Sequence, residues 1–431
     1  MDLLEKIRSH EAHLGVLGLG YVGLPLAVEC GKAGFTVTGI DINEERVAQL
    51  REGKSYIIDV PSEELAPLVA SGRFRPSTDF SLLRETDTVN ICVPTPLRKT
   101  KDPDVSFIVA AVERIRETLH RTQLIILEST TYPGTTDELI LPMLEETGLK
   151  VGEDFFLAFS PERVDPGNPR FNTQNIPKVV GGVTPRCTAA AATLYRQTLE
   201  TVVEVGSTRV AEMVKLLENT FRSVNIGLVN ELALMCRKMD IDVWEVIRGA
   251  ATKPFGFMPF YPGPGLGGHC IPIDPVYLSW KARAAGFEAR FIDLASAINA
   301  SMPRHVVDLV AEALNSRGRS VKGSRILVLG VAYKENIDDV RESPALDIIE
   351  QLRDRGAEVR FHDPLVKSID FDSGTLDTVP LEAAQLRETD CAVVVTAHRE
   401  IDFRAVLEAV PLLVDTRNCL PGVRDPKLFR L

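Results

Sequence analysis

Paired cysteines are missing from this sequence. It holds seven cysteines, an odd number, and no Cys-x-x-Cys pair occurs among Cys30, Cys92, Cys187, Cys236, Cys270, Cys391 and Cys419. Disulfide frameworks and zinc sites are built from paired or closely spaced cysteines, so the sequence predicts neither a disulfide scaffold nor a bound metal. Scattered thiols fit a reducing compartment, and we expect a cytoplasmic protein.

Long apolar runs and an excess of positive charge are also missing. The first residues lack the apolar run of a signal peptide, and no later run is long enough to span a bilayer, so no membrane association is expected. The 49 Lys and Arg are outnumbered by 60 Asp and Glu, which leaves a net charge of −11. That balance argues against a nucleic-acid partner, although a small anion needs only a local basic cluster.

The composition that remains is typical of a soluble globular protein, and 431 residues suffice for two or three domains. Glycine and proline concentrate in residues 262–275, which hold four of each and therefore form a loop with fixed turns. Cys270 lies on this loop, and Asp274 follows four residues later. The loop thiol is either a nucleophile with an acid/base neighbour or a buried structural cysteine.

A dinucleotide fingerprint lies near the N-terminus. An apolar strand from His13 enters a Gly-x-Gly-x-x-Gly turn that opens a helix, and a second strand over residues 35–40 ends in Asp41. In this pattern Gly18 allows the tight turn, Gly20 lets a pyrophosphate approach the backbone, and Gly23 lets the helix pack on the strand. The alternative for such a motif is a glycine-rich packing turn.

The acidic residue after the second strand selects the cofactor. Asp41 would accept hydrogen bonds from a ribose diol and repel a 2′-phosphate, which favours NAD over NADP. Arg46 is expected to stack on the adenine side, and Tyr21 and Val22 lie inside the turn. We therefore count all three among the cofactor-binding residues.

Polar residues follow three further apolar strands, which are expected over residues 88–93, 123–127 and 155–159. Thr95, Thr130 and Glu162 come after these strands, at the edge where a parallel doubly wound sheet binds its ligands. Each threonine is alternatively a helix cap or turn former. Glu162 is either a surface carboxylate or a group that orients or deprotonates water.

One long helix is predicted over residues 209–239, where apolar residues recur at helical spacing. Such a helix commonly links domains and offers a dimer surface, so a homodimer is expected. Lys215 and Asn219 share one face of it because they are four residues apart. They are either solvated or they point at the Cys270 loop, where an ammonium and an amide would hold an oxyanion.

The last part of the chain starts a second β-α-β pattern. A helix over residues 294–314 and a hinge over residues 318–323 precede a strand at 325–330 whose turn lacks the dinucleotide glycines. Lys334, Arg341 and Arg417 follow strands of this part, where positive side chains suit a pyrophosphate; ordinary surface residues are the alternative.

The predicted fold class is therefore α/β, with two Rossmann-like doubly wound domains joined by a long central helix. The predicted domains are an NAD-binding domain over residues 1–205, a central helical dimerisation domain with the cysteine loop over 206–317, and a Rossmann-like substrate domain over 318–431.

A nucleophilic cysteine beside one NAD site suggests the reaction. Oxidation of an alcohol needs only a base, whereas oxidation of an aldehyde to an acid proceeds through a thiohemiacetal and a thioester on a thiol. The residues by themselves predict cysteine-assisted, NAD-dependent oxidation of a phosphate-bearing substrate, and they do not tell a sugar nucleotide from a phosphorylated aldehyde.

Taken together, the motifs resemble the UDP-glucose/GDP-mannose dehydrogenase family. The matching stretches run in order along nearly the whole chain, at residues 18–25, 93–96, 129–134, 160–163, 215–219, 267–274, 330–334 and 341–344. The resemblance implies a four-electron oxidation of a sugar C6 hydroxymethyl to a carboxylate, consuming two NAD, in an enzyme that is usually a dimer built on the central helix.

The resemblance also implies roles for individual residues. Cys270 would be the nucleophile, Lys215 and Asn219 would stabilise the oxyanion, and Asp274 and Thr130 would assist through water. Glu162 would be the base for thioester hydrolysis. The expected contacts to the sugar nucleotide come from Glu162, Arg163, Lys215, Asn219, Gly267, Lys334 and Arg417, whereas Arg341 would meet the cofactor or a domain junction.

The motifs around residues 160–167 and 257–270 look like the N-acetylhexosamine branch of the family, with UDP-N-acetylglucosamine as the expected substrate in bacterial surface-polysaccharide synthesis. UDP-N-acetylmannosamine is the nearest alternative because it differs only in configuration at C2, and UDP-glucose is another. A nucleotide-sugar sensor without catalysis is the alternative of a different class.

Overall fold

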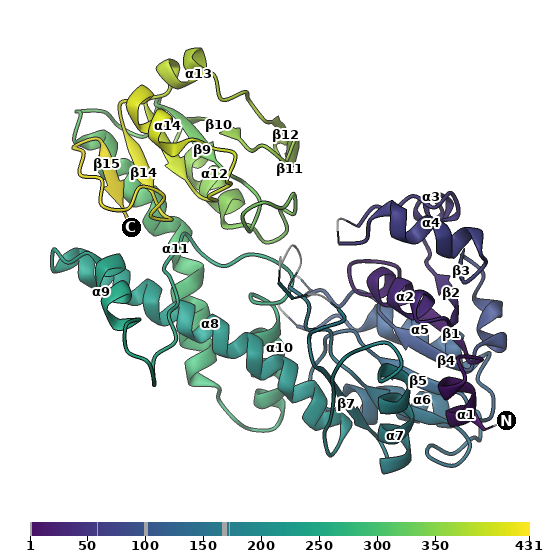
Figure 1. The fold of residues 1–431 in the computed structure, drawn as a ribbon. Helices are drawn as coiled ribbons and strands as arrows, with labels where there is room; N and C mark the ends of the chain where they lie inside the picture. Colours follow the sequence, from purple (N-terminus) through teal and green to yellow (C-terminus); the bar gives the residue numbers. More distant parts are fainter. Residues whose placement is uncertain (1, 58, 99–101, 166–169, 172) are drawn as a thin grey trace. The chain divides into compact units, whose positions relative to one another are not determined.

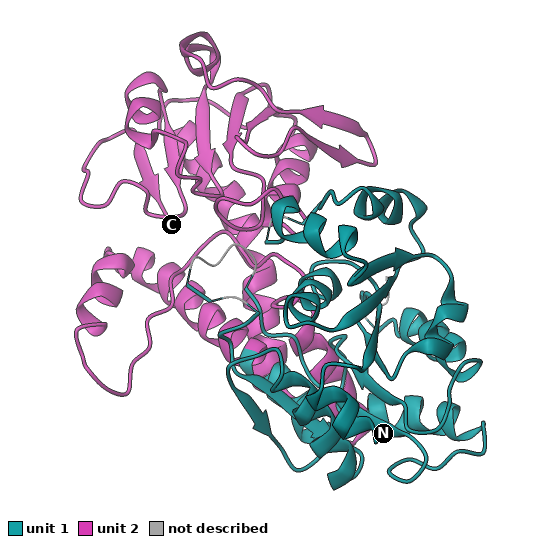
Figure 2. Ribbon diagram, turned by 45° about the vertical axis from the view of Figure 1, so that its right-hand side comes forward, with its two compact units in different colours: residues 1–218 teal, residues 219–431 magenta. Residues whose placement is uncertain are grey.

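The structure is a computed structural model that describes residues 2–57, 59–98, 102–165, 170–171 and 173–431. The chain forms two compact units, residues 1–218 and residues 219–431, which are coloured separately in Figure 2. The boundary between them falls inside one long helix, α8 (Thr208–Lys238), labelled in Figure 1.

The first unit is built on an eight-stranded sheet in the order β3-β2-β1-β4-β5-β6-β7-β8. Strands β1 to β5 and β7 are labelled in Figure 1. Neighbouring strands pair in parallel, except that β7 joins β6 in antiparallel. The order reverses direction between β1 and β4, and this reversal is where a doubly wound sheet binds its ligand. The strands are β1 (His13–Leu17), β2 (Thr36–Ile40), β3 (Phe74–Ser77), β4 (Thr88–Ile91), β5 (Leu124–Leu127), β6 (Phe156–Phe159), β7 (Lys178–Gly182) and β8 (Val202–Glu204).

Helices cover both faces of this sheet because successive strand residues point to opposite sides. Leu14 and Val16 of β1 pack with α1, α2, α4 and α7, whereas Leu17 packs with η1, α5, η2 and α6. These helices are α1 (Leu3–Arg8), α2 (Gly23–Lys32), α3 (Glu44–Arg51), α4 (Ser62–Ala70), the 3₁₀ helix η1 (Phe80–Glu85), α5 (Ser106–Arg116), the π-helix η2 (Thr135–Ile140), α6 (Leu141–Glu145) and α7 (Pro185–Tyr195).

The second unit holds a five-stranded parallel sheet in the order β10-β9-β13-β14-β15. This is the 2-1-3-4-5 order of the other common doubly wound fold, and its direction reverses between β9 and β13. The strands are β9 (Arg325–Leu329), β10 (Glu358–His362), β13 (Cys391–Val394), β14 (Leu413–Asp415) and β15 (Leu428–Arg430), and a separate antiparallel hairpin pairs β11 (Ser368–Phe371) with β12 (Gly374–Asp377).

Two helical layers again enclose the sheet. Ile326 and Val328 of β9 pack with α11 and α12, whereas Leu327 and Leu329 lie in the core that α13 and α14 close. The helices of this unit besides the end of α8 are α9 (Val243–Ala250), α10 (Asp274–Ala284), α11 (Arg290–Asn315), α12 (Pro344–Asp354), α13 (Ala383–Glu388) and α14 (Phe403–Ala409).

These observations confirm the predicted α/β class with two doubly wound sheets and a long central helix. The helix expected over residues 209–239 is α8, and the one expected over 294–314 is the longer α11. Strand β4 ends at Ile91, two residues before the expected end.

Candidate functional site

The turn after β1 is shaped for a phosphate-bearing ligand. Gly18 has φ +86°, and a Cβ built there would lie 2.5 Å from the carbonyl oxygen of Cys92, beyond β4. A Cβ on Gly23 would lie 1.8 Å from the carbonyl oxygen of Gly18, so only glycine lets α2 begin here. A Cβ on Gly20 would meet nothing within 4 Å, which leaves the backbone open toward the helix N-terminus.

Asp41 anchors this turn from the end of β2. Its Oδ2 accepts a hydrogen bond from the backbone N–H of Leu19 at 2.9 Å, and its Oδ1 accepts one from the N–H of Asn43 at 2.9 Å. A carboxylate has about four acceptor positions, so two remain for a ribose diol. The Tyr56 hydroxyl donates to the carbonyl oxygen of Leu19 at 2.6 Å, and the Arg46 guanidinium lies 5.3 Å from the Tyr56 ring centroid.

The residues present therefore fit a dinucleotide. An open glycine backbone meets a helix N-terminus, and an acidic residue stands at the adjoining strand end. Tyr21 is exposed, and Thr95 and Thr130 are half-buried after β4 and β5, at the carboxyl edge of the sheet. The cofactor roles of Tyr21, Val22, Arg46, Thr95 and Thr130 stay predictions.

A buried carboxylate from α8 holds the segment that follows Thr130. Glu212 accepts from the N–H of Gly134 at 2.6 Å, and from the N–H and hydroxyl of Thr136 at 2.9 and 2.8 Å. Burial raises the pKa of Glu212 above its ordinary value, although these three donors oppose the shift. The helix that carries Lys215 is thus tied to the Thr130 segment within the first unit.

Glu162 lies beside a buried ammonium group. Its Oε2 accepts from Nζ of Lys178 at 2.9 Å, and its Oε1 accepts from the backbone N–H groups of Arg163 and Val164 at 2.7 and 2.9 Å. Burial by itself would raise the pKa of Glu162, but the Lys178 charge and the hydrogen bonds outweigh it and lower the pKa. The carboxylate is therefore held ionised.

Arg163 is engaged by the protein itself. Its guanidinium donates two hydrogen bonds to the Glu218 carboxylate, at 3.1 and 2.5 Å, and one to the carbonyl oxygen of Pro177 at 2.7 Å. These bonds fix the guanidinium on α8. The contact of Arg163 to the substrate stays a prediction.

The cysteine loop of the second unit ends at the start of α10. The carbonyl oxygen of Cys270 accepts from the N–H groups of Ile273 and Asp274 at 3.1 and 2.8 Å. Asp274 is buried, and its Oδ2 accepts from Nδ2 of Asn219 at 2.5 Å. The structure thus brings Asn219 of α8 to the loop of the half-buried Cys270, and Lys215 lies one helical turn earlier on the same face.

The loop is fixed at both ends by the rest of the second unit. The N–H of Gly263 donates to Oδ1 of Asn230 at 2.9 Å, and a Cβ on Gly263 would lie 2.6 Å from the Arg417 guanidinium. At the other end the N–H of Gly268 donates to the carbonyl oxygen of Arg341 at 3.0 Å. A Cβ on Gly267 would lie 2.7 Å from Cβ of Tyr333, so glycine is required for this close packing.

The Arg341 side chain continues the contact. It pairs with the carboxylate of Asp339 and contacts Nε2 of His269, the residue before Cys270. The loop therefore packs against the segment that follows β9, and Arg341 lies at a junction within the second unit.

The turn after β9 repeats the design of the first unit. Gly330 has φ +77°, and a Cβ there would lie 2.2 Å from the carbonyl oxygen of Thr396, beyond β13. Lys334 is half-buried after this turn. Arg417 follows β14 and donates from Nε to the carbonyl oxygen of Val395 at 2.8 Å, and burial lowers the pKa of its guanidinium.

Asp363, after β10, takes the place that Asp41 has in the first unit. Its Oδ2 accepts from the N–H groups of Val331 and Ala332 at 2.7 and 3.2 Å and from Nε2 of His398 at 3.0 Å. Its Oδ1 accepts from two further backbone N–H groups, at 2.9 and 3.0 Å. Burial opposes ionisation, but His398 and these N–H groups prevail and lower the pKa of Asp363 to about 2.

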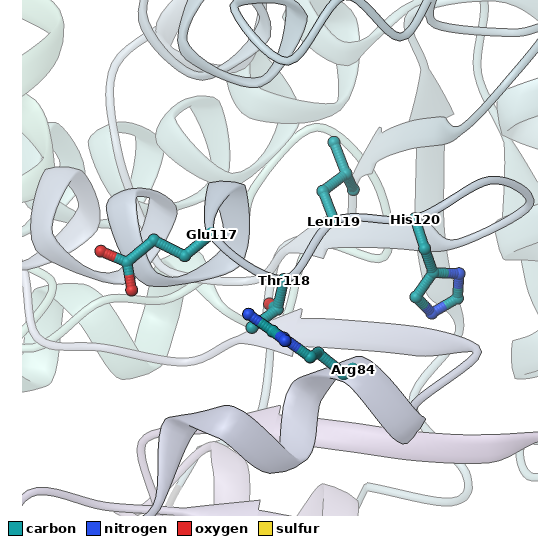
Figure 3. Close-up of a pocket in the computed structure, with 5 residues that line it drawn as sticks. All are labelled: Arg84, Glu117, Thr118, Leu119 and His120. Carbon is teal, nitrogen blue, oxygen red and sulfur yellow. The ribbon is translucent and has the colours of Figure 1, made fainter.

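The cavity drawn in Figure 3 is not part of these sites. It is lined by Arg84, Glu117, Thr118, Leu119 and His120. These residues precede β4 and β5, at the amino ends of the strands, whereas the candidate residues carried by the two sheets follow the carboxyl ends.

Two further features bear on ligands and membranes. No group of three or more His, Cys, Asp or Glu side chains within the described ranges could hold a metal ion. None of the helices that the structure describes combines the length and apolar character of a membrane span.

Five residues that hold the candidate site segments in place were not predicted from the sequence. They are Glu128, Lys178, Glu212, Asp363 and His398. A signal existed for Asp363, because it follows the second strand of its β-α-β unit as Asp41 does. No local pattern marks Lys178 or Glu212, because their partners lie far away along the chain.

Family models match successive parts of the chain. The NAD binding domain of the UDP-glucose/GDP-mannose dehydrogenase family matches residues 12–199, its central domain residues 209–301, and its UDP binding domain residues 327–422.

Individual relatives agree with these matches. A protein named UDP-N-acetyl-D-glucosamine 6-dehydrogenase from Pseudomonas aeruginosa is 40% identical over 361 residues, 83% of this chain and 84% of that protein. One of the same name from Salmonella typhi is 32% identical over 96% of this chain and 97% of its own. The solved structure of a UDP-D-ManNAc dehydrogenase from Pyrococcus horikoshii aligns with a TM-score of 0.89 and 34% identity, covering 97% of this chain and 98% of that chain.

Proposed function

The chain belongs to the UDP-glucose/GDP-mannose dehydrogenase family, and on that basis we propose that it oxidises the C6 hydroxymethyl of UDP-N-acetylglucosamine to a carboxylate. Family membership makes it a nucleotide-sugar dehydrogenase with an NAD-binding domain and a UDP-binding domain. The proposal extends to the sugar, the catalytic roles of individual residues, the assembly and the cellular location.

The observation that carries the proposal is the Asn219–Asp274 hydrogen bond beside the Cys270 loop. It fixes the amide of Asn219 next to the segment that holds the thiol, so an oxyanion formed at Cys270 has an oriented donor. Lys215, one turn away on α8, adds a positive charge to the same helix face. A cysteine with only a packing role would need neither an oriented amide nor a positive charge on the same helix face.

In the proposed mechanism the Gly18–Gly23 turn and Asp41 would hold NAD, which would supply the acceptor for one hydride at each of the two oxidation stages. The Cys270 sulfur adds to the aldehyde carbon, while Asn219 and Lys215 stabilise the oxygen that becomes negative.

The adduct is a thiohemiacetal, and loss of its hydride, for which NAD would be the acceptor, makes it a thioester. Water then breaks the C–S bond, which releases the acid and returns the Cys270 thiol. Glu162 takes the proton of that water, and Thr130 and Asp274 help to orient the water molecule. Lys334 and Arg417 hold the diphosphate, and Arg163 and Gly267 border the sugar.

The choice of sugar rests on two supports. Relatives named for UDP-N-acetyl-D-glucosamine and for UDP-N-acetyl-D-mannosamine both match most of this chain, which favours an N-acetylhexosamine. The loop motif before Cys270 favours the glucosamine configuration. UDP-N-acetylmannosamine is the second candidate, and UDP-glucose the third.

We further propose a homodimer formed through α8. The helix carries a stripe of exposed apolar side chains, made of Val210, Met213, Leu217, Phe221, Leu228 and Met235, whose exposed fractions run from 38% to 57%. A stripe of this kind is favoured to pack against a second copy. The proposed domains remain 1–205, 206–317 and 318–431. None of the seven cysteines, all of them described residues, is joined in a disulfide, which supports a cytoplasmic location.

The decisive test measures NADH formation with UDP-N-acetylglucosamine, UDP-N-acetylmannosamine, UDP-glucose and GDP-mannose. We expect kcat/KM to be at least about tenfold higher for the first sugar, because a polar contact made to one epimer is left unpaired by the other. Two NADH are expected per acid formed.

A Cys270→Ser variant tests the proposed nucleophile. It should fold and bind NAD but form no uronic acid, because an alcohol at this position is a poor nucleophile toward the aldehyde. One NADH per aldehyde product would reject the four-electron scheme. Binding of NAD and sugar nucleotide without any NADH would instead support the sensor.

A further inference from the structure

We propose that Lys178 is a positioning residue for the hydrolysis step, which keeps the Glu162 carboxylate ionised and oriented by sharing one positive charge between Glu162 and Glu128. This inference rests on the proposed function, in which Glu162 acts on water. Lys178 is the first residue of β7.

The geometry places one ammonium between two carboxylates. Nζ of Lys178 lies 2.6 Å from Oε2 of Glu128 and 2.9 Å from Oε2 of Glu162. The side chains of Lys178 and Glu128 are 5% and 0% exposed, and that of Glu162 is 13% exposed. Glu162 is thus the member of the cluster that reaches solvent, where a water molecule would be met.

Glu128 is held by other donors as well. Its Oε1 accepts from Nδ2 of Asn90 at 2.6 Å and from the hydroxyl of Tyr195 at 2.6 Å. It is therefore a fixed buried anion that competes with Glu162 for the ammonium. Breaking a buried pair leaves an unpaired charge, so the loss of either carboxylate changes the surroundings of the Lys178 ammonium.

Charged and titratable groups face this cluster from several elements. Besides Lys178 on β7 and Glu128 after β5, they are Cys30 on α2, Cys92 after β4, Tyr195 on α7, and the Arg163–Glu218 pair that links the Glu162 segment to α8. Burial together with Glu128 raises the pKa of Cys92 and of Tyr195, so both stay neutral near pH 7. Burial alone would lower the pKa of Lys178, but the two carboxylates reverse the shift and raise it.

Two substitutions are expected to act in opposite directions. In Lys178→Gln the charge is lost, so the acid limb of the kcat–pH profile should move up by about 1–3 pH units. In Glu128→Gln the competing anion is lost, so the full charge acts on Glu162 and the limb should move down. Lys178→Arg keeps the charge and should leave the limb within about half a unit of the parent profile.

The experiment measures kcat for acid formation against pH in the full-length protein with NAD and UDP-N-acetylglucosamine. Lys150→Gln is the matched control, because Lys150 is an exposed lysine of the same unit. Thermal unfolding and NAD binding are recorded for every variant, so that a folding defect is recognised. If Lys178→Gln does not fold, the kcat–pH profiles of Glu128→Gln and Lys178→Arg test the proposal in its place.

A second readout is independent of turnover. The ¹³C chemical shift of the Glu162 carboxyl, followed against pH, should show the same opposite displacements in the two variants. Identical titration in all variants, or displacement of both variants in one direction, would overturn the proposal. If the parent protein shows no NADH with any of the four sugars, the proposed function fails, and this titration still decides whether Lys178 sets the charge of Glu162.

Discussion

Buried carboxylates fix the turns on which both expected ligand sites are built. Asp41 accepts from the turn after β1, Asp363 from the turn after β9, and Glu212 from the segment after Thr130. In each case a side chain accepts from backbone N–H groups of a turn or of the first residues of a helix. These bonds hold the turns in the shape described above.

Asp363 is expected to make the protein sensitive to acid. Its pKa is about 2 in the folded protein against 3.8 for the free side chain. A lowered folded pKa contributes stability above the unfolded pKa, and that contribution is lost as the pH falls from about 4 to about 2. The lost free energy of unfolding is about 2 kcal/mol.

Chemical unfolding at a series of pH values measures this effect. Asp363→Asn should be less stable near pH 7, because an amide cannot accept all five hydrogen bonds. Its stability should also fall less steeply between about pH 4 and about pH 2. An unchanged slope in the variant would contradict the role given to Asp363.

At the scale of elements, α8 presents different chemistry on opposite faces. At 100° per residue, Glu212, Lys215 and Asn219 fall on one side, and the apolar stripe that contains Leu217 and Leu228 falls on the other. The helix can therefore carry the proposed site residues on one face and the proposed dimer surface on the other.

We expect charges in the stripe to break the proposed homodimer. The double variant Leu217→Glu/Leu228→Glu should be monomeric in analytical ultracentrifugation, because each protomer would bury two unpaired carboxylates in the contact. Arg222→Glu on the same helix, outside the stripe, is the matched control and should remain dimeric. A double variant that stays dimeric would place the contact elsewhere.

Periodicity explains which elements the sequence predicts well. Helix α8 is a long pattern of apolar residues at helical spacing, and strands β5, β6 and β9 are continuous apolar runs with clear ends. The structure confirms these four elements within about two residues. Strand β7 was not predicted, because it begins with Lys178 and ends in Gly181 and Gly182, which read as a loop. The hairpin β11–β12 is short and largely exposed, so it carries little hydrophobic signal.

The candidate site divides in the same way. The glycine turn, Asp41 and the Cys270 loop carry local signals, and the structure finds the turn, the acidic strand end and the loop where they were expected. The Lys178 cluster joins residues that are 16 and 50 positions apart, and a single sequence contains no pattern for such contacts. Only the fold brings them together.

At the scale of the whole molecule, each compact unit carries one nucleotide-binding sheet. Binding of the two nucleotides should therefore be separable by mutation. Asp41→Ala is expected to raise the Kd of NAD at least about tenfold, because it removes a charge-assisted acceptor and the anchor of the turn. The Kd of UDP should stay within about twofold.

Isothermal titration with NAD and with UDP measures both constants on the same preparation. Glu45→Ala is the control, because Glu45 is an exposed carboxylate on the neighbouring α3. Equal losses for both nucleotides would mean that Asp41 supports the fold as a whole rather than the cofactor site.

The two aspartates that follow strand ends, Asp41 and Asp363, differ in how many hydrogen-bond acceptor positions remain for a ligand. Among the described residues, Asp41 accepts two hydrogen bonds and Asp363 accepts five. A ribose hydroxyl that arrives at the second sheet finds that carboxylate already saturated by backbone and imidazole donors. As its concentration rises, NADH would therefore compete with NAD for the first sheet and would not displace the sugar nucleotide from the second. Product inhibition by NADH should be competitive toward NAD alone.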